Sequence, residues 1–322
     1  MNASLCFPAR RAVVDVGTNS VKLLVGDLEA GQITPVIEES RQTRLGEGFY
    51  AEHRLQAEPI ARTAETVRAF AEKARSLGAG QVRIVATSAA REAVNAEVLR
   101  AAILQAAGSP LEIISGEQEA ELGYQGVSTH PDWREARLLL VDLGGGSLQF
   151  TLGEAGRARL AQSFPLGCVR LLEKFRPGPR PEPGLLQKVR AEIGLFVETR
   201  VIPVLRPALD TPPGHPALLI GTGGTATILA RMERQMSGFD RAAIEETRLS
   251  TGAVRQWTDR LWGLPIEERR LIAGLPANRA DVVLFGAAIY GVIMEAFGFN
   301  ELRFSTRGLR FGALLTMAPP VC

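Results

Sequence analysis

Residues 141–154 read VDLGGGSLQFTLGE: an apolar strand that ends in the carboxylate of Asp142, a turn of three glycines, and a second strand. Only glycine lets a backbone bend this tightly and bring its N–H groups close to a ligand oxygen. A carboxylate beside such a loop suits Mg²⁺, which usually takes one or two carboxylates together with phosphate oxygens. The stretch therefore predicts a hairpin that binds phosphate at its turn.

The same pattern occurs earlier in the chain, where residues 14–27 read VDVGTNSVKLLVGD. Without gaps, an offset of 127 residues matches an acid, two glycines and a serine in the two copies. The matched pairs are Asp15 with Asp142, Gly17 with Gly144, Ser20 with Ser147, and Gly26 with Gly153. Two unrelated hairpins with ordinary glycine turns are the alternative, but the matched positions favour a repeat. We therefore predict two related domains, each opening with a phosphate-binding hairpin.

Composition and charge limit the classes of function. A chain of 322 residues has a length typical of about two domains, and 46% of its residues are hydrophobic, enough for a sizeable core. Lys and Arg number 37 against 35 Asp and Glu, a net charge of +2, which argues against a dedicated nucleic-acid binder. No membrane span is predicted, because the sequence has no uninterrupted apolar run of roughly 18 or more residues.

The few cysteines and histidines exclude several kinds of site. Cys6, Cys168 and Cys322 have no metal-ligand spacing and form no disulfide framework, which favours a reducing, cytoplasmic setting. The N-terminal stretch MNASLCFPARR lacks the apolar core of a signal peptide. The histidines are widely separated along the chain, so a histidine-based metal site or catalytic triad is not expected.

Strand and helix patterns alternate along the chain and predict an α/β fold. Apolar residues at helical spacing predict a helix over 57–77, and a buried strand follows at 82–88. The predicted first domain covers residues 1–127 and the second covers 128–307. A C-terminal helix over about 308–322 is expected to pack back on the first domain.

A predicted helix with the sequence EQEAELGYQGV carries three glutamates. Glu117 and Glu121 are four residues apart and share one face, whereas Glu119 points to the other side, near Gly123 and Gly126. These glycines are expected to leave open space around the Glu119 carboxylate. From spacing alone, a solvated helix glutamate is the favoured interpretation of Glu119.

A third glycine loop lies in residues 218–232, LLIGTGGTATILARM, which combine an apolar strand, a Thr/Gly loop and the start of a helix. N–H groups at such a loop-to-helix junction favour anions. A tight packing turn explains the same pattern equally well, so this loop alone does not decide its own role.

Together these motifs resemble the exopolyphosphatase / guanosine pentaphosphate phosphohydrolase family, within the superfamily of actin, Hsp70 and sugar kinases. The resemblance covers nearly the whole chain. The matching stretches are DVGTNSVKLLV (15–25), VATSAAREAVN (85–95), ISGEQEAELGYQGV (114–127), LVDLGGGS (140–147), LGCVRL (166–171), IGTGGTAT (220–227), ADVVLFGA (280–287) and STRGLR (305–310). The family implies an α/β fold of two ribonuclease-H-like (actin-like ATPase) domains with an interdomain cleft.

The resemblance implies roles for three carboxylates. Glu119 matches the glutamate of the family motif G-x-[EQ]-E-A and is implied to be the catalytic base that deprotonates an attacking water. Asp142 matches the acid that helps to hold Mg²⁺ or the water, and Asp15 is its counterpart in the first domain. The implied catalytic residues are therefore Glu119 and Asp142. The implied ligands of Mg²⁺, or of another divalent cation, are Asp15, Asp142 and Glu119.

The resemblance also marks phosphate-binding positions. These are Thr18, Asn19, Ser20, Lys22, Gly144, Gly145, Gly146, Ser147, Cys168, Gly223, Gly224 and Thr225. Lys22 replaces an arginine often found in the family, which keeps the charge but loses the bidentate fork. Arg91 is taken as a further phosphate-binding residue, and bracing of its loop is an equally good interpretation.

The sequence departs from the family pattern in three respects. Family members usually read GGGSTE, whereas Gln149 stands here in place of the glutamate and removes a negative charge from the expected metal or water site. The usual GLREG is GLRFG at 308–312, which loses another glutamate. The extra helical domains of longer relatives are not expected in this chain.

The resemblance implies a cytoplasmic, Mg²⁺-dependent phosphoanhydride hydrolase with a role in the stringent response, which releases terminal phosphate from inorganic polyphosphate, guanosine pentaphosphate or both. Residues 168–190 carry a net charge of +4, enough to attract a short polyanion, so short chains are expected to be preferred. One alternative is a (p)ppGpp- or polyphosphate-sensing binding protein with weak catalysis, which Gln149 keeps open. Another is a kinase of the same superfamily, against which the glutamate motif argues. Neither nucleic-acid nor membrane binding is expected, and a homodimer stays open.

Overall fold

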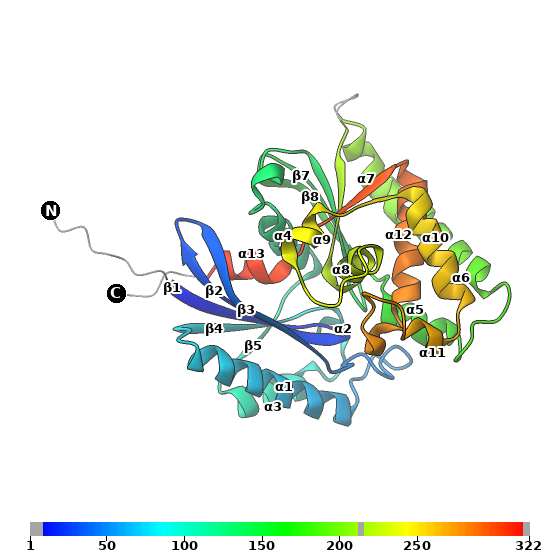
Figure 1. Ribbon diagram of the computed structural model, residues 1–322. Helices are drawn as coiled ribbons and strands as arrows, with labels where there is room; N and C mark the ends of the chain where they lie inside the picture. Colours follow the sequence, from blue (N-terminus) through cyan, green and yellow to red (C-terminus); the bar gives the residue numbers. More distant parts are fainter. Residues whose placement is uncertain (1–8, 212–215, 318–322) are drawn as a thin grey trace. The chain divides into compact units, whose positions relative to one another are not determined.

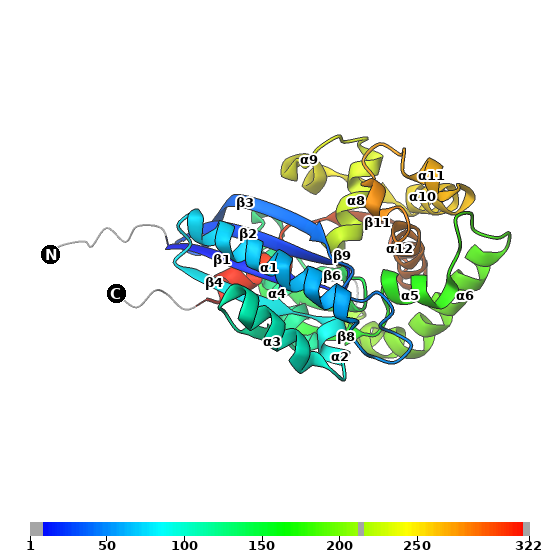
Figure 2. The same ribbon diagram turned by 90° about the horizontal axis from the view of Figure 1, so that it is seen from below.

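The computed structural model describes residues 9–211 and 216–317, drawn as ribbons in Figures 1 and 2. Strands and helices alternate along most of this length. No helix within these residues is both long and apolar enough to cross a membrane. Of the residues singled out in the sequence, Cys6, Cys322 and the last part of the predicted C-terminal helix, 318–322, lie outside the described residues.

The chain divides into two compact units. Within the described residues, unit 1 comprises 9–129 and 307–317, and unit 2 comprises 130–211 and 216–306. The polypeptide therefore passes between the units twice, after Thr129 and after Thr306.

Unit 1 is built on a mixed sheet with the strand order β3-β2-β1-β4-β5. The strands are β1 (Ala9–Val16), β2 (Ser20–Glu29), β3 (Gln32–Gln42), β4 (Gln81–Ala86) and β5 (Leu111–Ile113). β1, β2 and β3 form two consecutive antiparallel hairpins, whereas β1, β4 and β5 run parallel and are connected through helices.

Helices cover both faces of the unit 1 sheet. Side chains alternate between the two faces along each strand, and here both sets are apolar, so each face packs against helices. The helices are α1 (Ala57–Ser76), α2 (Ser88–Glu92), α3 (Ala96–Ala107), α4 (Gly116–Val127) and α13 (Leu309–Leu315). Val14 and Leu23 belong to a core cluster formed with α1 and α3. Val13 and Leu24 belong to a second cluster, formed with α4 and α13 on the opposite face (Figure 1).

Two glycines allow α13 to pack directly on α4. A Cβ atom at Gly312 would lie 1.9 Å from the carbonyl oxygen of Leu122, and one at Gly126 would lie 2.2 Å from the carbonyl oxygen of Gly308. Any side chain at either position would force two backbone segments apart. The C-terminal helix is therefore held on unit 1 by backbone-to-backbone contact, over a span shorter than the sequence predicts.

Unit 2 contains a sheet with the strand order β10-β11-β9-β6-β7-β8. The strands are β6 (Leu138–Leu143), β7 (Leu148–Glu154), β8 (Arg157–Phe164), β9 (Leu218–Thr222), β10 (Arg248–Ser250) and β11 (Glu301–Phe304). From β8 to β11, the order and the pairing directions repeat those from β3 to β5 in unit 1, and β10 is an added antiparallel edge strand. The predicted α/β fold of two related domains is confirmed.

The helices of unit 2 gather around α12 (Val283–Phe297), which is buried on nearly every face. The others are η1 (Pro131–Trp133), α5 (Cys168–Phe175), α6 (Leu185–Phe196), the π-helical η2 (Val197–Val201), α7 (Ile202–Leu209), α8 (Gly223–Glu233), α9 (Arg241–Glu246), α10 (Thr251–Gly263), α11 (Ile266–Arg269) and η3 (Ala277–Arg279). Of these, α5, α6, α8 and α10 contact α12, so one apolar helix organises much of the unit.

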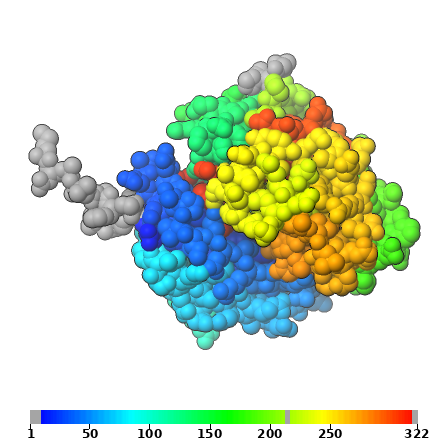
Figure 3. Space-filling view, in the orientation of Figure 1, coloured from blue at the N-terminus to red at the C-terminus, as the bar shows by residue number. Residues whose placement is uncertain are grey.

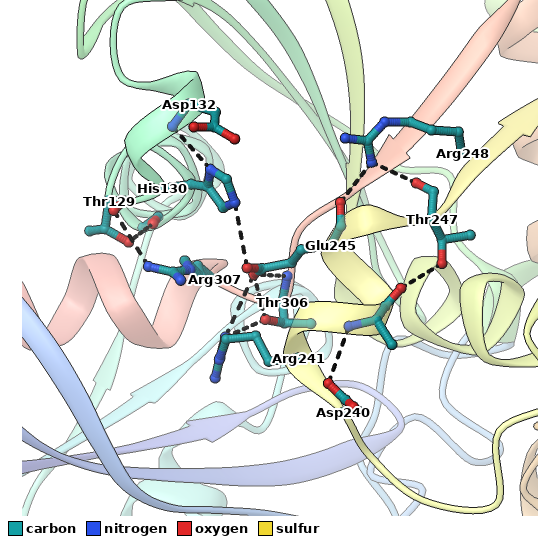
Figure 4. Close-up of polar contacts among 12 residues, drawn as sticks. Thr129, His130, Asp132, Asp240, Arg241, Glu245, Thr247, Arg248, Thr306 and Arg307 are labelled. Carbon is teal, nitrogen blue, oxygen red and sulfur yellow. Dashed lines mark hydrogen bonds and ion pairs between the residues drawn. The ribbon is translucent and has the colours of Figure 1, made fainter.

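A buried carboxylate, Glu245 on α9, anchors both ends of unit 2 (Figure 4). Its Oε1 accepts hydrogen bonds from the backbone N and the Oγ1 of Thr306, at 3.1 and 2.7 Å. Its Oε2 lies 3.8 Å from Nε2 of His130, and Arg241 Nη1 lies 3.7 Å from Oε1. The segment around α9 forms part of the surface in Figure 3, yet Glu245 is only 6% exposed. One side chain thus binds the last residue of unit 2 by hydrogen bonds and lies beside the first.

Glu245→Ala is expected to lower the free energy of unfolding by about 2–4 kcal/mol, because it leaves the Thr306 N–H buried without its acceptor and removes the charge facing Arg241. Glu245→Gln keeps an acceptor oxygen and should lose clearly less. Urea unfolding followed by tryptophan fluorescence measures this, since Trp133, Trp257 and Trp262 all lie in unit 2. Equal losses in the two variants would contradict the assignment of Glu245 as an acceptor.

Candidate active site

The two glycine turns have the same backbone geometry. In unit 1 the N–H of Gly17 donates to the carbonyl of Ser20 at 3.0 Å, and in unit 2 the N–H of Gly144 donates to the carbonyl of Ser147 at 3.0 Å. A Cβ atom at either glycine would lie 3.1 Å from that same carbonyl oxygen. The repeat seen in the sequence is therefore a repeat in space, and it extends to a register shift in each outer strand pair, at 25/26 and 152/153.

Each unit also carries a row of three polar residues across three adjacent strands, β1-β2-β3 in unit 1 and β6-β7-β8 in unit 2. The rows are Asp15, Lys22 and Ser40 in unit 1, and Asp142, Gln149 and Ser163 in unit 2. Directly paired residues on neighbouring strands project their side chains to the same face. Sequence comparison did not match the two serines. The second hairpin of each unit, β2–β3 and β7–β8, differs in length, so the offset of 127 residues no longer applies at the third strand. The register of the third strand is the signal that finds them.

The unit 1 turn is backed by the segment that follows β3. The Thr18 carbonyl accepts from the N–H of Gly46 at 2.7 Å, and the Asn19 carbonyl accepts from the N–H groups of Thr43 and Arg44 at 3.2 and 3.0 Å. A planar trans peptide directs its C=O and its N–H to opposite sides. The N–H groups that follow these two carbonyls therefore point away from the backing segment.

The unit 2 turn is backed in the same way, by the start of α5. The Gly145 carbonyl accepts from the N–H groups of Val169 and Arg170 at 2.8 and 3.2 Å, and Nε of Arg170 donates to the Gly146 carbonyl at 3.1 Å. A Cβ atom at Gly167 would lie 2.4 Å from the Gly145 oxygen, so the approach needs glycine. The next N–H groups of the turn point away from α5, an arrangement that suits an anion.

Asp142 lies beside the third glycine loop, at the start of α8. β6 and β9 run parallel and pair Asp142 with Thr222. A Cβ atom at Gly223, whose φ is +89°, would lie 2.7 Å from Oδ1 of Asp142. Gly224 is exposed and a Cβ atom there would meet nothing within 4 Å. The structure thus brings the predicted residues of unit 2 together at the carboxyl ends of two parallel strands.

Cys168 lies behind the turn rather than in front of it. Its N–H donates to the Gly144 carbonyl at 3.2 Å, and its Sγ is 3.5 Å from Oγ1 of Thr225. Burial raises the pKa of the thiol to about 11, so it is neutral near pH 7. Both side chains, predicted to bind phosphate, are buried and contact each other.

Tyr290 supports the same strand ends from α12. Its hydroxyl lies 3.3 Å from the carbonyl oxygens of both Val141 and Thr222. Burial is the main cause that raises the pKa of the Tyr290 hydroxyl well above its usual value, and the negative charge of Asp142 is the second. The hydroxyl therefore keeps its proton and remains a hydrogen-bond donor. Sequence reasoning missed Tyr290, because nothing in the local pattern of an apolar helix indicates which strand it will meet.

Glu119 sits in the first turn of α4 within unit 1. Ser115 and Gln118 form a capping box that fixes where this helix begins. Glu119 is 8% exposed, and its Oε2 accepts from Nη1 of Arg91 at 3.1 Å, while the same nitrogen donates to the Ile114 carbonyl at 3.0 Å. The interpretation as a solvated helix glutamate is therefore wrong, and Arg91 braces Glu119.

The expectation that glycines leave open space beside Glu119 is wrong for Gly126. That residue faces the backbone of 307–308, at the short distance given above, and Gly123 is buried as well. Helical spacing correctly placed the glycines on one face, but the last segment of the chain fills that face.

Asp15 and Lys22 face each other across the first hairpin. Lys22 Nζ lies 3.7 Å from Oδ2 of Asp15, and Asp15 is 7% exposed. The cation predicted to contact phosphate thus lies beside the carboxylate predicted to hold metal. The equivalent position in unit 2 carries the neutral Gln149.

Comparison of the whole chain with known proteins places it in a family. The model of the Ppx/GppA phosphatase family matches residues 24–320. The chain belongs to this family. It is 36% identical to exopolyphosphatase 2 of Mycobacterium tuberculosis, over 96% of this chain and 98% of the relative. It is 28% identical to exopolyphosphatase 1 of Mycobacterium bovis, over 95% of this chain and 87% of the relative.

Solved Ppx/GppA structures share the fold. A PPX-GPPA enzyme from Aquifex aeolicus has a TM-score of 0.77 at 28% identity, covering 96% of this chain and 99% of that chain. An exopolyphosphatase from Cytophaga hutchinsonii has a TM-score of 0.84 at 27% identity, covering 96% and 97%. The family resemblance drawn from the motifs is confirmed, and the chain is a phosphatase.

The second departure from the Ppx/GppA pattern has a structural explanation. In GLRFG, Phe311 stands in place of the usual glutamate and is 1% exposed in the cluster between α4, α13 and the sheet. Arg310 of the same motif donates to the Leu23 carbonyl at 2.8 Å and pairs with Glu38 at 3.1 Å. In this Ppx/GppA protein the motif therefore contributes to the packing of unit 1.

Glutamates from outside the basic stretch 168–190 neutralise part of its positive charge. Glu192, just beyond it, lies 2.5 Å from Lys174, and Glu295 on α12 lies 2.7 Å from Arg190. Arg170 is occupied by the turn carbonyl. The net charge counted along the stretch overestimates what a polyanion meets.

Proposed function

We propose that this phosphatase is an exopolyphosphatase, which releases the terminal phosphate of inorganic polyphosphate and prefers short chains. The observation that supports this most directly is the Glu119 carboxylate, buried and held by Arg91. A general base must be held in a fixed position to take a proton from water, and the contact with the Arg91 guanidinium holds the Glu119 carboxylate. The relatives named exopolyphosphatase in two mycobacteria support the substrate class.

In the proposed reaction, a water attacks the terminal phosphorus while Glu119 takes up its proton. A bond forms between the water oxygen and phosphorus, and the bond from phosphorus to the bridging oxygen breaks. The shortened chain leaves with that electron pair. Each of the turns 17–20 in unit 1 and 144–147 in unit 2 offers backbone N–H groups that suit phosphate oxygens. Since hydrogen bonds on the carbonyl side already fix both turns, little reorganisation accompanies the reaction.

Asp142, with Asp15 as its counterpart, fits the chemistry of Mg²⁺ or another divalent cation. Both are carboxylates, the hard oxygen ligands that Mg²⁺ prefers, and Oδ1 of Asp142 lies beside the exposed loop at 223–224. Over residues 9–211 and 216–317, no group of three or more His, Cys, Asp or Glu side chains could hold a metal ion. Asp142 and Asp15 would therefore each offer a bound cation one carboxylate, and such a cation would take other oxygen ligands from phosphate and water. When bound, it neutralises charge on the reacting phosphate.

Guanosine pentaphosphate is proposed as a second substrate, because its terminal phosphoanhydride offers the same reacting group. A polyphosphate- or (p)ppGpp-sensing protein with weak catalysis is the second candidate function, and the neutral Gln149 beside Asp142 favours it. Phosphate release from both substrates, measured side by side with and without Mg²⁺, separates the two. The buried free thiol of Cys168 fits a cytoplasmic location.

Hydrolysis of long polyphosphate is expected to be non-processive. Within the stretch 168–190, Lys174 and Arg190 are paired with glutamates, which lowers the net positive charge that a polyanion meets there, so a long chain should dissociate between cleavages. A gel time course on long polyphosphate is expected to show gradual shortening of the whole population. Disappearance of full-length chains without intermediates would overturn this expectation.

A further inference from the structure

Gln149 forms two hydrogen bonds through one amide group. It lies on β7 and is 2% exposed. Its Nε2 donates to Oγ of Ser147 at 2.7 Å, at the end of the glycine turn, and to Oγ of Ser163 at 2.9 Å, on the neighbouring strand β8. Both amide hydrogens are therefore used, one on each serine.

This arrangement fixes the polarity of the Ser147 hydroxyl. A hydroxyl has one hydrogen to donate and two lone pairs with which to accept. Because Ser147 accepts from the amide, its own hydrogen stays free to be donated to a further acceptor. Ser147 ends the turn whose N–H groups point away from α5, so its side chain adds a donor next to those of the backbone.

We infer that Gln149 is a positioning residue that orients the Ser147 hydroxyl as a donor to a phosphate oxygen of the substrate. This inference rests on the proposed function of the turn. A glutamate at 149, the residue usual in GGGSTE, can only accept. It would take the hydroxyl hydrogens of Ser147 and Ser163 and would add a negative charge opposite Asp142.

The first hairpin is consistent with this arrangement. Its equivalent of Gln149 is Lys22, which also is a donor and faces Asp15. Both polar rows of this chain thus contain a single carboxylate followed by a hydrogen-bond donor and a serine. A phosphate meets less negative charge here than beside a pair of carboxylates, so its binding depends less on a cation.

Calorimetric binding of inorganic phosphate in the presence of EDTA tests the inference. In the wild-type background, Ser147→Ala should weaken binding about ten- to hundredfold, the usual cost of a hydrogen bond to a charged group. In the Gln149→Glu background, the same substitution should weaken binding by less than about twofold, since the hydroxyl already faces the carboxylate. The comparison cancels the effect of the added charge itself.

Two further variants complete the design. Ser163→Ala removes the second partner of the amide but leaves the bond to Ser147, so it should change phosphate affinity by less than about threefold. Gln149→Met removes both donors without adding charge; it replaces Gln149→Glu if that protein does not fold, and should likewise reduce the cost of Ser147→Ala. An equal cost of Ser147→Ala in all backgrounds would overturn the inference. If the cost of Ser147→Ala depends on residue 149 as expected but the protein does not hydrolyse polyphosphate, only the proposed function is rejected. If the protein hydrolyses polyphosphate but Ser147→Ala costs the same in every background, only the inference is rejected.

Discussion

Glu119→Gln is expected to lower kcat for phosphate release about 10²–10⁴-fold, the usual contribution of a general base. The amide keeps the shape of the side chain and an oxygen for Arg91 Nη1, so the helix start and the brace should remain. What it loses is the ability to take up the proton of the attacking water. Substrate affinity should change little, because the proposed phosphate contacts come from the glycine turns and the Ser147 hydroxyl, not from Glu119. Initial rates on tripolyphosphate at saturating concentrations, with Mg²⁺ present, measure the effect.

Glu121→Gln is the matched control. It removes the same charge from the same helix, two residues away, but Glu121 is exposed. Its kcat should stay within about twofold of wild type. If Glu119→Gln retained a near-wild-type kcat, or if the two variants behaved alike, Glu119 would not be the base.

Gly312→Ala is expected to lower the free energy of unfolding of unit 1 by about 3 kcal/mol, the upper part of the usual range for overpacking. The added methyl would lie 1.9 Å from the Leu122 carbonyl oxygen, and backbone cannot move aside as a flexible side chain does. α13 should separate from α4, exposing the cluster that contains Phe311. Amide hydrogen exchange in α4 and α13, together with urea unfolding followed by circular dichroism, measures the loss.

Gly194→Ala, in α6, provides the contrast. It is also a glycine inside a helix, but a Cβ atom there would meet nothing within 4 Å. Alanine should stabilise this helix by about 0.5–1 kcal/mol, because glycine loses more backbone entropy on folding. The same sign of change in both variants would show that close packing at Gly312 does not decide its effect.

The fold could be predicted largely because its signals are local. Strand patterns, glycine turns and the matched residues of the repeat can each be recognised within a short stretch of sequence. The structure contains the two predicted hairpins, at Asp15 and at Asp142. The candidate site could be predicted only in part. Glu119 was found through its motif, but the motif does not show that it is buried or that it contacts Arg91 in another helix.

What the sequence could not predict comes from contacts between distant segments. Gly126 was assigned to open space, and only the course of residues 307–308 shows that it is packed. Tyr290 comes from a helix far along the chain, and the pairing of Ser163 with Gln149 depends on strand register. Periodicity specifies which side of an element a residue occupies, but not which part of the chain will cover that side.

The backing of the two turns explains which of their residues can differ between the two halves of this protein. GTNS and GGGS differ at both central positions, Thr18 against Gly145 and Asn19 against Gly146, yet in each turn these two carbonyls are tied from behind. The affinity for a ligand that is bound by backbone N–H groups does not depend on the side chains of the two central residues. The two central residues can therefore differ between the copies, while the flanking aspartate, glycine and serine, which set the course of the backbone, are the same in both.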